Sequence, residues 1–189
     1  VPPHNMGEVV DATIHLIRNP DAPVDDLMRF VAGPDFPTAG LIYGRAGIDA
    51  YQRTGRGSVI MRARMNVEKA QGRGEREQVV VTEIPYQVNK ARVHARIGEL
   101  MREKKIEGIS EVRDESDRDG IRLVIELKKD VIPQVVINQL YRLTDLQTSF
   151  GVINLAIVGG RPAVLNLRES LDVFIRHRRD VVTRRTRYD

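Results

Sequence analysis

The stretch from Gln78 to Met101 places a strand and a helix one after the other, and it constrains the fold more than any other part of the chain. Residues 78–84 are rich in β-branched side chains, which favour a strand. Pro85 then ends that strand, because proline has no N–H to donate to a sheet. A helix is predicted next, from apolar residues spaced at i, i+4, i+7 and i+8: Val93, Ile97, Leu100 and Met101.

The first turn of this predicted helix carries an unusual charge. Asn89 is a suitable N-cap, and Lys90 and Arg92 follow it directly. The helix dipole disfavours cations at this end, so a phosphate bound beside the free backbone N–H groups would explain both side chains. The alternative is that both are simply solvated at a small cost, and the residues alone leave the two explanations open.

Upstream of this stretch we expect short helices and then a long hairpin. Asn5 and Glu8 indicate a capping box for a helix that ends near residue 19, and helices are also predicted at 21–31 and 45–53, with a short strand at 39–43. Residues 59–67 alternate apolar and polar side chains, with Arg62 and Arg64 on the polar side. They are predicted to pair with residues 75–84 across a tip at 71–74.

Downstream, the patterns predict strands at 109–113, 121–128 and 146–158 and a helix at 133–143. Asn166 and Glu169 form a second capping box before a final helix. Its predicted coiled-coil seam consists of Leu167, Leu171, Phe174, Arg178, Val181, Arg185 and Tyr188. The expected fold is α/β (α+β): a two-layer sandwich with a mainly antiparallel mixed sheet, preceded by short helices and followed by the start of a long coiled-coil helix.

Composition fits a soluble globular chain that can bury one good core in its 189 residues, of which 41% are hydrophobic and 30% charged. There is no apolar run near 18 residues and no signal-like N-terminus. Cysteine is absent, which excludes disulfides and thiolate zinc sites and suits a cytoplasmic protein.

The net charge is +4, but two stretches are much more basic than the rest. Residues 45–76 carry 8 basic and 3 acidic side chains, and residues 161–189 carry 8 and 4. Two basic stretches on a nearly neutral body indicate a polyanion-binding surface. Two solvated faces would give the same composition, so this alternative also stays open.

No catalytic or metal site is predicted. The four histidines are scattered, and no cluster of Cys and His could hold a transition metal. Residues 115–126 place acidic side chains at several positions of a calcium loop, but we reject that site. Arg122 stands where an apolar residue belongs, and the predicted flanks are strands rather than helices.

Several motifs, in order, resemble the A subunits of DNA gyrase and topoisomerase IV, the bacterial type IIA topoisomerases, with the last of them closer to gyrase. They are Pro2-Pro3-His4-Asn5, Gly33-Pro34-Asp35-Phe36-Pro37-Thr38, Thr54-Gly55-Arg56-Gly57, Glu83-Ile84-Pro85-Tyr86-Gln87-Val88-Asn89-Lys90-Ala91-Arg92, Arg113-Asp114-Glu115-Ser116-Asp117 and the run from His177 to Thr186. The resemblance covers the whole chain.

This resemblance implies three regions and an inactive piece of an enzyme. Residues 1–44 would be the end of the DNA-cleaving winged-helix region with its connector, 45–165 the tower domain, and 166–189 the start of the coiled-coil helix. The whole enzyme would be an ATP-hydrolysing type II topoisomerase that pairs this polypeptide with a second copy of the same kind and with a B subunit. Its catalytic tyrosine would lie upstream of Val1, and ATP and magnesium would be bound by other domains and the B subunit, with no cofactor in this piece.

The predicted partner is double-stranded DNA, gripped and bent through its phosphates without sequence preference and in a salt-dependent manner. The predicted DNA-binding residues are Arg53, Arg56, Arg62, Arg64, Lys90 and Arg92. The alternative function is a rigid spacer between the cleavage core and the coiled coil, with little DNA binding of its own.

Overall fold

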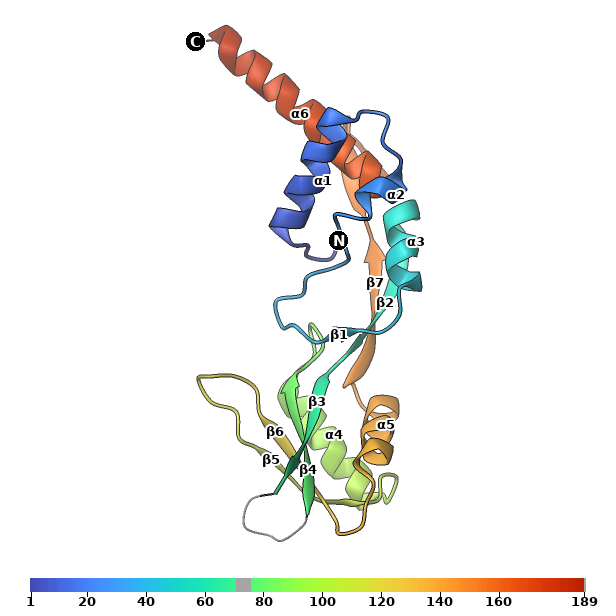
Figure 1. Ribbon diagram of the computed structural model, residues 1–189, viewed down its shortest axis with the longest axis vertical. Helices are drawn as coiled ribbons and strands as arrows, with labels where there is room; N and C mark the ends of the chain where they lie inside the picture. Colours follow the sequence, from blue (N-terminus) through green and yellow to red (C-terminus); the bar gives the residue numbers. More distant parts are fainter. Residues whose placement is uncertain (71–75, 189) are drawn as a thin grey trace. The chain divides into compact units, whose positions relative to one another are not determined.

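The structure is a computed structural model that describes residues 1–70 and 76–188, and it has the predicted α+β class (Figure 1). The predicted tip at 71–74 lies outside the described residues. In chain order the elements are α1 (Met6–Arg18), α2 (Val24–Leu27), β1 (Leu41–Ile42), α3 (Ala46–Thr54), β2 (Arg56–Arg62), β3 (Arg64–Lys69), β4 (Glu77–Glu83), α4 (Lys90–Arg102), β5 (Ile109–Asp114), β6 (Leu123–Leu127), α5 (Pro133–Leu143), β7 (Gln147–Ile153), β8 (Leu155–Val158), β9 (Arg161–Val164) and α6 (Leu167–Tyr188).

The chain divides into two compact units. Unit 1 contains residues 1–36, 44–59 and 150–189, and unit 2 contains residues 37–43 and 60–149. The division at residues 44/45 and 165/166 that the sequence suggested stays a prediction.

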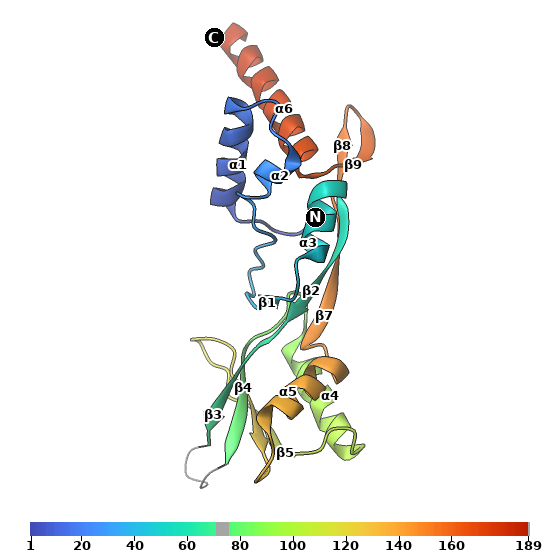
Figure 2. The ribbon, with the colours of Figure 1, turned by 45° about the vertical axis from the view of Figure 1, so that its right-hand side comes forward.

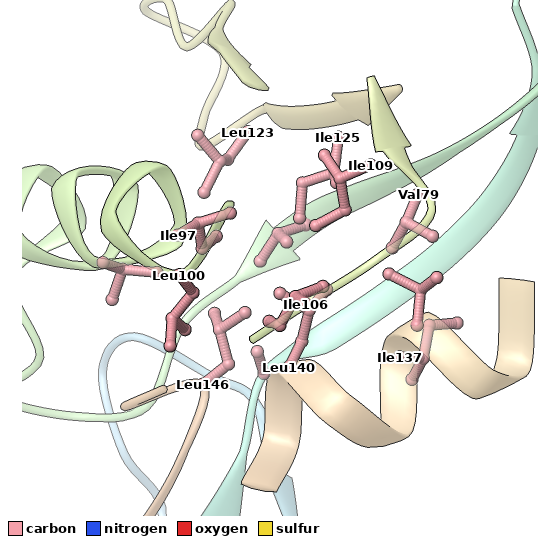
Figure 3. Packing of buried hydrophobic residues seen from close by; sticks show 14 of the residues in the cluster. Val79, Ile97, Leu100, Ile106, Ile109, Leu123, Ile125, Ile137, Leu140 and Leu146 are labelled. Carbon is pink, nitrogen blue, oxygen red and sulfur yellow. The ribbon is translucent and has the colours of Figure 1, made fainter. Parts of the chain in front are cut away.

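Unit 2 is built on a four-stranded sheet in the order β3-β4-β6-β5, whose neighbours all pair antiparallel. Alternate residues of its strands point to one face, and α4 and α5 cover that face (Figures 1 and 2). Figure 3 shows Ile97 and Leu100 of α4 and Ile137 and Leu140 of α5 packed with residues of the strands and of the connecting turns: Val79, Ile106, Ile109, Leu123, Ile125 and Leu146. The two-layer prediction is therefore confirmed for this unit.

The strand predicted at 59–67 is divided between two sheets. β3 pairs with β4 as expected, but β2 belongs to a separate sheet in the order β1-β2-β7. Between them Ala63 is fully buried, and its N–H donates to the carbonyl of Leu146, 2.8 Å away. The alternation of side chains continues through this point, so periodicity alone could not reveal the change of sheet.

The strand predicted at 146–158 is also divided. β7 ends at Ile153, and Asn154 uses its backbone N–H and carbonyl to bond Gly55 and Leu165, at 2.8 and 2.9 Å. The chain then forms the hairpin β8–β9, visible in Figure 2, instead of ending at Val158. The sequence signal for its turn was Gly159-Gly160, both with positive φ, which the prediction treated only as a strand terminator.

Unit 1 has a small core in which α1, α2 and α6 meet. Leu171 and Ile175 of α6 are buried against Ala12, Leu16 and Leu27. Phe174, which the sequence placed on a coiled-coil seam, is 53% exposed. None of the helices in the described residues combines the length and the apolar character that crossing a membrane requires.

The two predicted capping boxes behave differently. Asn166 and Glu169 bond each other's backbone N–H groups reciprocally, each at 2.8 Å. Asn5 does cap α1, but Glu8 accepts a hydrogen bond from the backbone of Ala32 instead. The helix predicted at 21–31 is likewise reduced to the four residues of α2.

Candidate nucleic-acid interface

The start of α4 is capped as predicted, and its first cation has a partner within the chain. The Asn89 side chain accepts from the backbone N–H of Arg92 at 3.2 Å. The Lys90 ammonium lies 2.8 and 3.0 Å from the two carboxylate oxygens of Asp114, at the end of β5. The carboxylate of Asp114 therefore occupies the position beside Lys90 where a phosphate was considered.

This pair gives a testable pH effect. Hydrogen bonds from Lys90 and then from Ser116 lower the pKa of Asp114 to about 2. Because the folded pKa is depressed, the pair stabilises the fold above the ordinary pKa of 3.8, and the contribution is lost as the pH falls through about 2. We expect Lys90→Gln to raise the pKa of Asp114 towards its ordinary value, as measured by NMR titration of the side-chain carboxyl. An unchanged titration curve would contradict the pairing.

Arg92 points largely into solvent. Its side chain is 81% exposed, and its closest carboxylate oxygen, on Asp145, is 3.9 Å away. Arg92 and Arg96 line the same surface depression of about 370 Å³, between α4 and the turn that precedes β7. Sequence reasoning missed Arg96, although its spacing of four residues from Arg92 was a visible signal.

Arg53 and Arg56 belong to unit 1. Arg53 forms an ion pair with Asp25, and this hydrogen bond raises the pKa of the guanidinium. Arg56 follows Gly55, which ends α3 with a positive φ of 76°. The Arg56 side chain is exposed and forms no ion pair with any residue of 1–70 or 76–188. Its guanidinium is therefore available to an external anion.

Arg62 and Arg64 have different surroundings although they are two residues apart. Arg64 lies 3.0 Å from the carboxylate of Glu83, whose pKa is lowered by the Gly40 backbone N–H and by Arg64. The guanidinium of Arg62 lies over the rings of Tyr43 and Tyr141, 3.7 and 4.7 Å from their centroids. Its Nε also donates to Gln147 at 2.6 Å. Arg62 is thus held by long-range contacts that no local pattern could indicate.

The six predicted residues are therefore divided between the two units: Arg53 and Arg56 in unit 1, the other four in unit 2. Within the described part of the chain, no group of three or more His, Asp or Glu side chains could hold a metal ion. The chemistry on offer is ionic contact and hydrogen bonding to an anion.

The family model for the A subunit of DNA gyrase/topoisomerase IV matches residues 1–189. The chain belongs to this family. The DNA gyrase A protein of Pseudomonas aeruginosa is 57% identical over 189 residues, which are 100% of this chain and 20% of that protein. The DNA gyrase A protein of Salmonella typhimurium is 51% identical, and that of Helicobacter pylori strain 26695 is 50% identical, again over the whole chain and over 21% and 22% of those proteins. This member of the gyrase/topoisomerase IV A family thus spans about a fifth of the length of the curated relatives that it matches.

Proposed function

We propose that this chain is the tower segment of a bacterial type IIA topoisomerase and that it grips the outer arms of a DNA duplex through phosphate contacts. Membership of the gyrase/topoisomerase IV A family supports the assignment. The observation that carries the DNA contact is the depression beside α4, where the highly exposed Arg92 lies next to Arg96. Guanidinium groups suit this task because their planar N–H donors match phosphate oxygens.

The carboxylate partners do not prevent such contacts. The pairs made by Arg53, Arg64 and Lys90 all have partly exposed side chains on both partners. Exposed ion pairs contribute little to stability and are screened by salt, so an arriving phosphate can replace the carboxylate. Arg62 contributes least, because its donors and its faces are already engaged by Gln147 and two tyrosines.

In this proposal the chain neutralises phosphates and holds a bent duplex. Bending a site of 20–30 base pairs costs about 1–6 kcal/mol, which contacts to the arms would offset. Cleavage, ATP hydrolysis and magnesium binding would belong to other parts of a cytoplasmic enzyme that contains two gyrase A-type polypeptides and a B subunit. The chain alone would be inactive in strand passage.

We expect the chain to bind a labelled duplex of about 30 base pairs, with an affinity that falls as salt rises. Arg92→Gln should make the slope of log K against log salt shallower by about one unit, because one phosphate contact is lost. Fluorescence anisotropy between low and moderate salt measures this slope. Arg118→Gln removes the same charge from an exposed loop outside the depression and should leave the slope unchanged. Equal effects of the two substitutions would refute the assignment of Arg92.

The spacer function is the second candidate, and the ion pairs are what favour it. Arg53, Arg64 and Lys90 each have a carboxylate of the chain within 4 Å, and Arg62 is stacked on tyrosines. A spacer needs no cations that are available to DNA, and these four already contact side chains of the chain itself. Absence of duplex binding even at low salt would select the spacer over the DNA-gripping segment.

A further inference from the structure

Unit 2 carries a groove of about 1050 Å³ that the DNA-binding proposal does not use. It lies between the turn after α4, the turn before α5, and α5 itself. We call it the lysine-rimmed groove, after Lys104, Lys128 and Lys129, which line it together with apolar residues of α5. All of its lining residues belong to unit 2.

The floor of the groove is apolar and open to solvent. Ile132 is 66% exposed and Val135 is 50% exposed. Ile132, the N-cap of α5, and Val135, Val136 and Gln139 follow one another at i, i+3, i+4 and i+7. Val136 is fully buried in the core, so the exposed apolar part of this stripe is Ile132 and Val135. Such a stripe is a ridge against which a second helix can pack, and here no described residue of the chain covers Ile132.

The rim of the groove is cationic. Lys104, Lys128 and Lys129 are exposed and form no ion pair with any other described residue. Glu107 and Asp130 also line the groove, so the lysines outnumber the carboxylates.

Backbone hydrogen bonds hold both rims before any partner arrives. The N–H of Lys128 donates to Gly108 at 2.8 Å, and the N–H of Lys105 donates to Leu100 at 2.9 Å. Gly108 has a φ of 91°, and a Cβ there would come within 2.8 Å of Val131. A rim fixed in this way loses little conformational entropy when a partner binds.

We propose that the lysine-rimmed groove docks an acidic amphipathic helix of a partner protein. An apolar stripe on that helix would cover Ile132 and Val135, and its flanking Asp or Glu side chains would face the lysines. A DNA backbone fits less well, because phosphates gain nothing from the exposed apolar floor. A helix of about three turns would match the length of α5.

A library of helical peptides displayed on phage tests this without knowledge of the natural partner. Selection on the unmodified chain alone should enrich peptides with an apolar stripe flanked by Asp or Glu. In fluorescence anisotropy the selected peptides should bind Val135→Asp at least tenfold more weakly. They should also bind the double variant Lys128→Glu, Lys129→Glu several-fold more weakly, with the loss reduced at high salt.

Val182→Asp is the matched control, because Val182 is 43% exposed on α6, in unit 1. It should leave peptide affinity unchanged, and thermal melts should show that all the variants are folded. Enrichment of peptides without acidic residues, or equal binding to Val135→Asp, would overturn the proposal. The proposal would also be overturned if the chain formed a dimer that Val135→Asp dissociates, because the groove would then bind a second copy. It would likewise be overturned if the double lysine variant lowered the salt slope of duplex binding, because the groove would then bind DNA.

Discussion

Replacing Gly57 by alanine is expected to lower the free energy of unfolding of unit 1 by about 3 kcal/mol or more, because the new methyl group has no room. A Cβ at Gly57 would lie 2.6 Å from the carbonyl oxygen of Gly47 and 2.9 Å from the backbone nitrogen of Tyr51. These are backbone atoms of α3, so the overlap is relieved only if the helix moves away from β2. Tyr51 is 1% exposed and would be displaced from its packing.

Gly151→Ala is the matched control, since nothing lies within 4 Å of a Cβ built there. It should change stability by no more than about 0.5 kcal/mol. Urea unfolding followed by circular dichroism gives the overall change, and hydrogen exchange at the amides of 46–58 locates it. If Gly57→Ala were as well tolerated as Gly151→Ala, the close packing of α3 on β2 would be wrong.

Gly57 also shows what the sequence could and could not predict. The two glycines of Gly55-Arg56-Gly57 indicate a place where another group can approach the backbone closely, but the sequence does not say which group. In the structure the neighbours of Gly57 are Gly47 and Tyr51 of the same chain. A glycine can indicate that a side chain has no room at its position, but which residue fills the space depends on the tertiary structure.

The same limit separates the elements that were predicted well from those that were not. The helix at 133–143 was predicted with the bounds that it has in the structure, and the strands on both sides of residues 114–120 were confirmed, because each has its own periodic pattern and its own terminators. The change of sheet at Ala63 was missed because it depends on a bond to Leu146, far along the chain. Local patterns specify elements, and distant pairing decides which sheet each strand joins.

For the candidate interface, the sequence identified the cationic residues but not the side chains that contact them. The Lys90–Asp114 pair joins residues 24 apart, and the Arg62 contact with Gln147 joins residues 85 apart. A cation on a helix or strand surface is therefore predictable, whereas its availability to an external anion is not. This is why the sequence predicted DNA binding for both Arg62 and Arg92, although their surroundings differ in the structure.

Arg62→Ala is expected to reduce the stability of unit 2 by about 2–3 kcal/mol while leaving duplex affinity nearly unchanged. The loss combines two cation–π contacts of about 0.5–2 kcal/mol each with a charged hydrogen bond to Gln147, less whatever the tyrosines regain by repacking. Arg62→Lys keeps the charge but loses the planar fork, so it should recover only part of the stability. Urea unfolding measures stability, and anisotropy with the duplex measures affinity under conditions where the variants are folded.

Arg64→Ala is the neighbouring control, because Arg64 is exposed and Glu83, on the paired strand, is its one ion-pair partner among the described residues. It should cost less than about 1 kcal/mol of stability. A double-mutant cycle with Tyr43→Leu should give a coupling energy of about 1 kcal/mol with Arg62 and none with Arg64, since only Arg62 lies over that ring. A large drop in duplex affinity on Arg62→Ala, with stability intact, would return Arg62 to the DNA-binding surface. The opposite pattern would establish it as the contact that fixes β2 to Tyr43 and to α5.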